Sequence, residues 1–191
     1  MSFEAFAVST GVVALGEMGD KTQLLALLLA ARFRAPRPII LGILVATALN
    51  HTLAAALGSW LTHWLDPQWL RWGLGASFIA VALWLLIPDR AGDATEGRGS
   101  GRLGVFGVTT LAFFLAEMGD KTQIATVMLA ARYDALLTVT AGTTLGMMIA
   151  NVPAVLLGER AVKFVPIAWV HGIAAAVFAA LGVAILAGVG A

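Results

Sequence analysis

The seven residues EMGDKTQ at positions 17–23 return unchanged at positions 117–123, and each copy lies inside a long apolar stretch. Each copy carries two acids, one lysine and a glycine between the acids. Charged side chains deep in a membrane segment are costly, so their presence there points by default to a function. A duplicated pair of acids in such surroundings therefore indicates an ion pathway built from two matching halves.

The two halves of the chain are similar beyond these seven residues. Between 11–32 and 111–132, 12 of 22 positions are identical at a fixed offset of 100. Gly42 matches Gly142, and Gly58 matches Gly158. This pattern predicts an internal duplication.

The composition predicts an integral membrane protein. Hydrophobic residues make up 60% of the 191 residues and charged residues only 12%, whereas a soluble domain normally carries about 25% charged residues. The chain has no cysteine, which excludes disulfides and sulfur-ligated zinc. Its net charge of +1 and the lack of a basic patch give no sign of a nucleic-acid partner. No basic region precedes the first apolar run, so we expect that run to stay as a membrane span.

The apolar runs predict six membrane-spanning helices, since a span needs about 20 mostly apolar residues. The predicted fold class is an all-α integral membrane protein with a first three-helix repeat at 1–88, a charged and glycine-rich cytoplasmic linker at 89–102, and a second three-helix repeat at 103–191. Because three is an odd number, the second repeat is expected to be inverted relative to the first. The predicted spans are 5–31, 38–62, 69–87, 103–131, 135–158 and 164–190.

The basic residues of the loops predict the orientation. If the N-terminus is outside, the cytoplasmic loops hold eight arginines and lysines and the outer loops hold two. Cytoplasmic loops are normally the basic ones, so both termini are predicted outside. The eight inner residues are Arg32, Arg34, Arg37, Arg90, Arg98, Arg102, Arg160 and Lys163, and the two outer ones are Arg71 and Arg132.

The acids of the motif are the first candidates for a cation site. Residues three apart lie on one face of a helix, so Glu17 and Asp20 are expected to project together, as are Glu117 and Asp120. The glycine between them permits close helix approach or a local unwinding. Four carboxylates and two lysines leave two negative charges, which one divalent cation or two protons would neutralise. Such a site suits the exchange of one for the other.

Further oxygen donors lie in the motif and in the second span of each half. They are predicted to be secondary ligands or partners of the ligands: Thr22, Thr122, Gln23, Gln123, Asn50 and Asn151. Oxygen donors suit Ca²⁺, Mn²⁺ or Mg²⁺ better than copper or zinc. His51 is open to two interpretations, a proton relay or a structural hydrogen-bonding group.

The pattern Glu-x-Gly-Asp-Lys/Arg-Ser/Thr, present twice in two three-span halves, resembles the Gdt-type cation/proton exchangers, also called the second calcium/cation antiporter family. These are Golgi manganese and calcium transporters and bacterial manganese exporters. The resemblance covers the chain from the first predicted span to the last. It implies that Glu17, Asp20, Glu117 and Asp120 meet at the centre and bind Mn²⁺ or Ca²⁺. It also implies export of the cation from the cytoplasm against protons, across a bacterial inner membrane.

Two other functions use the same acids: a cation or proton channel, and a membrane-embedded metalloenzyme. The sequence lacks a His-Glu-x-x-His zinc motif, so no enzyme activity is expected. No cofactor is predicted apart from the transported cation. The expected partners are membrane lipid, the divalent ion and protons. Stripes of small residues leave open whether helices also pack between chains in a homo-oligomer.

Overall fold

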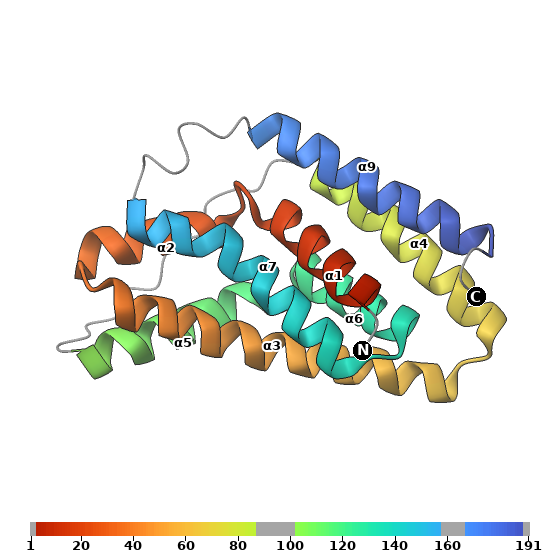
Figure 1. Ribbon diagram of the computed structural model, residues 1–191, viewed down its shortest axis with the longest axis horizontal. Coiled ribbons are helices and arrows are strands. Elements are labelled where there is room, and N and C mark those ends of the chain that lie inside the picture. Colours follow the sequence, from red (N-terminus) through yellow and green to blue (C-terminus); the bar gives the residue numbers. More distant parts are fainter. Residues whose placement is uncertain (1–2, 87–101, 158–166, 189–191) are drawn as a thin grey trace.

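The computed structural model describes residues 3–86, 102–157 and 167–188, and within these ranges the chain is helical and has no strand (Figure 1). The predicted all-α class is therefore confirmed. The predicted linker lies outside the described residues except for its last residue, Arg102. The helices are α1 (Phe3–Glu17), α2 (Lys21–Phe33), α3 (Pro36–Trp64), α4 (Pro67–Leu85), α5 (Arg102–Glu117), α6 (Lys121–Tyr133), α7 (Leu136–Leu157) and α9 (Ile167–Leu186).

Two of the predicted spans are not single helices, which corrects the prediction for 5–31 and 103–131. The first consists of α1 and α2, and the second of α5 and α6. The cause is the motif glycine, because Gly19 has φ 83° and Gly119 has φ 75°. Glycine adopts this left-handed conformation without the penalty of a Cβ atom. Each aspartate that follows is extended and begins the next helix.

The ends of the helices keep the spacing of the sequence duplication. α2 ends at the left-handed residue Arg34, with φ 49°, and α6 ends at the left-handed residue Asp134, with φ 43°. Prolines begin α3 and α4, where a missing backbone N–H costs little. Asp66 caps α4 by accepting a hydrogen bond from the backbone N–H of Gln68 at 2.8 Å.

Helices of one half of the chain pack mainly against helices of the other half. α1 packs on α7, α5 packs on α3, and α3 and α7 also contact each other. The contact points are equivalent: a Cβ atom at Gly142 would lie 2.9 Å from Cβ of Ser9, and one at Gly42 would lie 2.8 Å from Cβ of Thr109. Small residues allow helix backbones to come this close.

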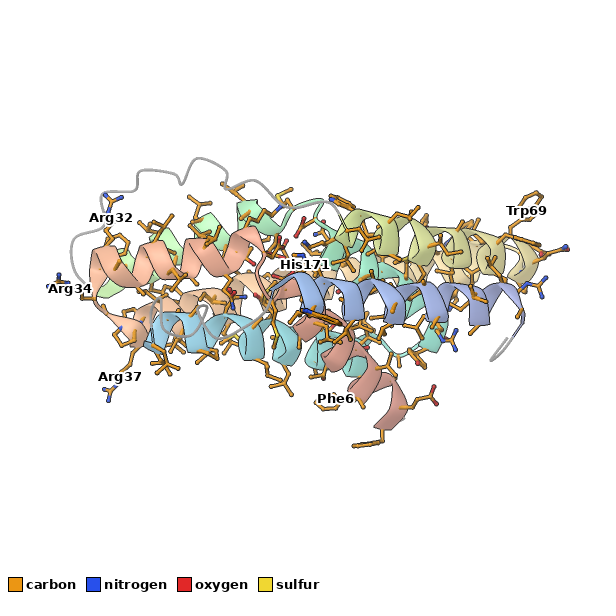
Figure 2. All side chains as sticks on the ribbon, turned by 90° about the horizontal axis from the view of Figure 1, so that it is seen from above. Phe6, Arg32, Arg34, Arg37, Trp69 and His171 are labelled. Carbon is orange, nitrogen blue, oxygen red and sulfur yellow. The ribbon has the colours of Figure 1, made fainter. Side chains whose placement is uncertain are left out.

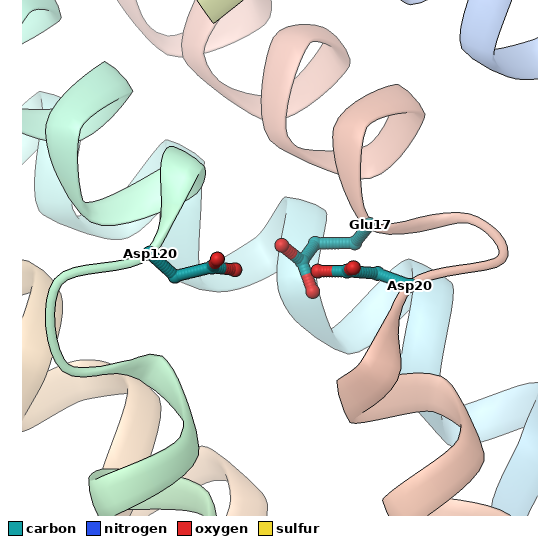
Figure 3. Close-up of side chains that lie close together, drawn as sticks. All are labelled: Glu17, Asp20 and Asp120. Carbon is teal, nitrogen blue, oxygen red and sulfur yellow. The ribbon is translucent and has the colours of Figure 1, made fainter. Parts of the chain in front are cut away.

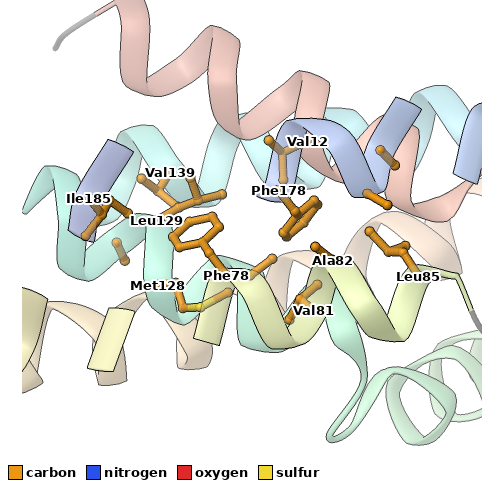
Figure 4. Packing of buried hydrophobic residues seen from close by; sticks show 14 of the residues in the cluster. Val12, Phe78, Val81, Ala82, Leu85, Met128, Leu129, Val139, Phe178 and Ile185 are labelled. Atoms are coloured by element: carbon orange, nitrogen blue, oxygen red, sulfur yellow. The ribbon is translucent and has the colours of Figure 1, made fainter. Parts of the chain in front are cut away.

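The bundle has two hydrophobic cores along its length. One, here called the α4/α9 core, joins α1, α3, α4, α6, α7 and α9 (Figure 4) and includes Val12, Phe78, Leu85, Met128, Leu129, Val139, Phe178 and Ile185. The other, here called the α2/α5 core, joins α2, α3, α5 and α7 and includes Ala26, Leu29, Ile39, Ile43, Val105, Phe113 and Val155. α4 and α9 lie side by side and cover only the first of these regions.

Three helices in the described ranges are long and apolar enough to cross a membrane: Pro36–Trp64, Leu136–Leu157 and Trp169–Leu186. The segment Gly104–Glu117 is apolar but shorter. Along the long axis of the bundle, Arg32, Arg34 and Arg37 lie at one end and Trp69 lies at the other (Figure 2). The two ends therefore differ in character, one basic and one aromatic.

Candidate metal centre

The two helix breaks face each other in the middle of the bundle and bring three carboxylates together (Figure 3). One oxygen each of Glu17, Asp20 and Asp120 lies within 4.8 Å of the others, and all three residues are buried. Two of the acids come from the first copy of the motif and one from the second. The centre is thus shared between the halves of the chain.

The fourth predicted acid, Glu117, is buried but is not part of this close cluster. It occupies the same place at the end of α5 as Glu17 does at the end of α1. The two copies are therefore alike in local structure and unlike in how closely their glutamates approach the other acids.

Hydrogen bonds within each copy hold the break and orient its glutamate. Thr22 donates its hydroxyl to Oε2 of Glu17 at 2.6 Å, and the backbone N–H of Gly19 donates to Oε1 of Gln23 at 3.0 Å. A glutamine in the first turn that reaches back to the backbone is a known way to begin a helix. The second copy repeats both bonds, at 3.1 Å between Thr122 and Glu117 and at 2.7 Å between Gly119 and Gln123.

Several carboxyl oxygens in or beside the cluster have no hydrogen-bond partner among the described residues. They are Oε1 of Glu17, Oε1 of Glu117 and Oδ2 of Asp120, and each is buried. Burying an unpaired charge is costly, so these oxygens need a cation or a proton. The donor set is all oxygen, which fits a hard divalent ion.

Two ion pairs cross between the copies. Nζ of Lys21 lies 3.1 Å from Oδ1 of Asp120, and Nζ of Lys121 lies 3.0 Å from Oδ1 of Asp20. Each lysine follows its own aspartate in the sequence but pairs with the aspartate of the other copy. The side chain of Lys21 is 31% exposed, whereas that of Lys121 is 2% exposed.

The predicted asparagines lie on the long helices beside the centre. Asn50 donates to the carbonyl of Phe114 at 3.1 Å, and Asn151 donates to the carbonyl of Met147 at 3.1 Å. Each leaves its buried amide oxygen without a partner in the described part of the chain. Gln23 donates to the carbonyl of Ala150 at 2.9 Å and so ties α2 to α7. Both asparagines remain candidate ligands.

The surroundings of two histidines, His51 and His171, were not predicted from the sequence. His51 is fully buried, and neither ring nitrogen has a partner among the described residues. Nε2 of His171 on α9 lies 2.9 Å from the carbonyl oxygen of Met18. The end of α1 leaves carbonyls without helical partners. Had the sequence predicted a helix break at Gly19, a hydrogen-bond donor near the carbonyl of Met18 could have been expected.

An all-helical chain whose buried acids lie at two helix breaks has the architecture of a membrane transporter. The model of one family, "Divalent cation/proton antiporter GDT1", matches residues 5–93 and 105–190. The chain belongs to this family of divalent cation/proton antiporters. The family consists of transporters and not of enzymes, as the sequence predicted.

Curated relatives are found in bacteria and plants. The chain is 49% identical over 179 residues to the "Putative manganese exporter" of Vibrio cholerae serotype O1, covering 93% of this chain and 88% of the relative. It is 30% identical over 174 residues to a GDT1-like protein of Synechocystis, covering 81% and 83% of the two chains. It is 29% identical over 185 residues to GDT1-like protein 3 of Oryza sativa, covering 82% and 64%. No solved structure matches the chain.

Proposed function

We propose that the protein exports a divalent cation from the cytoplasm in exchange for protons. One observation carries the proposal: buried acids from both copies of the motif surround one place, and several of their oxygens have no partner among the described residues. In this proposal Glu17, Asp20, Glu117 and Asp120 bind the cation and take up protons in alternation. Thr22, Thr122, Gln23 and Gln123 orient the glutamates and hold the breaks, and Asn50 and Asn151 add oxygen ligands.

The proposed cation is Mn²⁺, with Ca²⁺ as the competing substrate. Both ions prefer oxygen ligands, and the choice between them depends on the size of the site and on the number of ligands. The name of the relative from Vibrio cholerae, which is 49% identical, favours manganese.

Charge neutrality supports exchange with protons. Four ionised carboxylates and two lysines leave two negative charges at the centre. One divalent cation neutralises them, and so do two protons, so the centre is uncharged in either loaded form. An uncharged centre costs less to move through a low-dielectric interior than a charged one.

We place the centre within two inverted three-span repeats, at 1–88 and 103–191. In this arrangement α1 with α2 and α5 with α6 each form one span that is broken at the midplane. The equivalent contacts of Gly142 with Ser9 and of Gly42 with Thr109 support the symmetry. The arginines at one end of the bundle support a cytoplasmic position for that end, with both termini outside a bacterial inner membrane. Alternating access would arise from rocking one repeat against the other.

The test is metal-driven proton movement in sealed liposomes that contain the purified protein. A pH-sensitive dye is trapped inside, the membrane potential is clamped, and Mn²⁺, Ca²⁺ or Mg²⁺ is added outside. We expect Mn²⁺ to enter and protons to leave, and Glu117→Gln to stop both. Asp66→Asn is the matched control, because Asp66 is exposed and asparagine also caps a helix. Metal entry without proton movement would instead indicate a channel or a uniporter.

A further inference from the structure

The cluster of three carboxylates already holds two positive charges. Asp120 pairs with Lys21 and Asp20 pairs with Lys121, at 3.1 and 3.0 Å. Both lysines lie at the first position of a half-helix, α2 or α6, directly beside the break. A divalent cation that enters the cluster therefore meets two ammonium groups that occupy oxygens it would use.

We propose that Lys21 is a tethered competitor of the transported cation, which occupies Asp120 when the centre is empty and swings off that carboxylate, while staying beside the break, when the cation enters. The inference rests on the proposed function, because it takes the carboxylate cluster as the cation's site. It adds a residue that determines which ions bind and from which side.

The exposure of the two lysines decides which one withdraws. The Lys21 side chain is 31% exposed at the surface of the chain and sits on a long flexible stem, so its ammonium has room to swing away from Asp120. The Lys121 side chain is 2% exposed, and its pair with the fully buried Asp20 has no such route. Opening the Lys121 pair would separate two opposite charges in the buried interior, which is strongly unfavourable.

The packing around α2 and α6 explains the difference. α4 packs against α6, and Met128 of α6 is 3% exposed within the α4/α9 core. Its counterpart on α2, Leu28, is 54% exposed. The more exposed of the two lysines thus lies on α2, which leads toward Arg32 and Arg34 at the basic end of the bundle. That end is the one proposed to face the cytoplasm, from which an exporter must load.

A tethered ammonium also selects by charge. A monovalent cation at Asp120 would replace one positive charge with another and gain little. A divalent cation adds a charge that the unpaired oxygens of Glu17 and Asp120 require. Lys21 therefore favours divalent over monovalent ions while weakening the binding of both.

The chain has no cysteine, which allows the charge at position 21 to be removed and restored. Mn²⁺ binding to the purified protein is measured by the electron paramagnetic resonance signal of the free ion. Lys21→Met and Lys21→Cys should bind Mn²⁺ at least tenfold more tightly than the natural protein. Aminoethyl methanethiosulfonate should return Lys21→Cys to the original affinity, because it adds an ammonium, whereas methyl methanethiosulfonate should not.

Lys121→Cys is the matched control, and it should react with either reagent at least tenfold more slowly than Lys21→Cys. Unchanged Mn²⁺ affinity in both Lys21 variants, or equal effects of the two reagents, would overturn the role of Lys21. If those results accompany Mn²⁺–proton exchange by the natural protein in liposomes, only the inference about Lys21 fails. If the natural protein neither binds Mn²⁺ nor exchanges it, the proposed function fails.

Discussion

The two copies of EMGDKTQ have the same local structure and different surroundings. Asp20 has φ −79° and ψ 169°, and Asp120 has φ −81° and ψ 167°. In both copies the glutamine accepts from the glycine N–H and the threonine donates to the glutamate. Yet Lys21 is partly exposed and Lys121 is buried. The seven residues determine the break, and other helices determine access to it.

The helices that make the difference are α4 and α9. They lie together against α1 and α6 and form a core with them, while α2 lies outside this core. His171 of α9 also contacts the break of the first copy at the carbonyl of Met18. Its counterpart at an offset of 100 is Arg71, whose guanidinium lies 5.9 Å from the centroid of the Trp72 ring and near Gly188, just after α9. The seven-residue motif is thus repeated unchanged, whereas the packing around its two copies is not symmetric.

The largest expected effect comes from removing one acid from either copy. Glu17→Gln and Asp120→Asn should each lower Mn²⁺ transport by about 100-fold or more, because one centre needs acids from both copies and charge stabilisation of this kind is worth several kcal/mol. Transport is measured in liposomes with equal amounts of folded protein. Natural rates in either variant would show that the copies act separately.

The next effect concerns the approach of α3 to α6, the half-helix that is buried. A Cβ atom at Gly58 would lie 2.2 Å from the carbonyl oxygen of Val127. Gly58→Ala should therefore destabilise the protein by about 1–3 kcal/mol, the usual cost of overpacking. Gly11→Ala is the control, because no atom lies within 4 Å of its Cβ position, and it should be neutral or slightly stabilising. Thermal unfolding in detergent compares them, and equal midpoints would contradict the close contact.

A smaller effect should follow from straining the second break without a clash. Gly119 has φ 75°, and no atom lies within 4 Å of its Cβ position. Gly119→Ala should cost about 1–2 kcal/mol, because only the left-handed backbone conformation opposes the side chain. Thermal unfolding in detergent measures the loss. A variant as stable as the natural protein would mean that the break does not require this conformation.

The smallest expected effect concerns the contact that only the first copy makes with α9. His171→Ala removes a hydrogen bond to the carbonyl of Met18 and should destabilise the protein by about 1 kcal/mol. Arg71→Ala changes the counterpart position and tests whether the contact is specific to α9. Reactivity of a cysteine at position 18 should rise in the His171 variant and stay unchanged in the Arg71 variant. The opposite order would contradict the asymmetry.

The all-helical class could be predicted from the long apolar runs. The acids could be chosen as candidate ligands because charged residues that recur within such runs stand out in the sequence. The breaks could not, since Gly19 is compatible with a continuous helix and with an unwound one. Helical spacing predicted that Glu17 and Asp20 lie together, and they do, but the cause is not a continuous helix. The turn at Gly19 folds Asp20 back beneath the end of α1.

The crossed ion pairs could not be predicted either, because they depend on distances between the two halves. Lys21 is adjacent to Asp20 in sequence but bonds to Asp120. The unequal exposure of Lys21 and Lys121 could not be predicted from two identical motifs. It depends on side chains far away in the sequence, such as Phe78 and Phe178, which hold α4 and α9 over one end of the bundle.

The central claim is that two copies of the motif make one cation site. The most direct measurement is the number of Mn²⁺ ions bound per chain, from a titration of the purified protein followed by electron paramagnetic resonance. We predict one ion per natural chain, and none in either Glu17→Gln or Glu117→Gln at the same Mn²⁺ concentration. Two ions per natural chain, or one ion left after a single copy is disabled, would contradict the account.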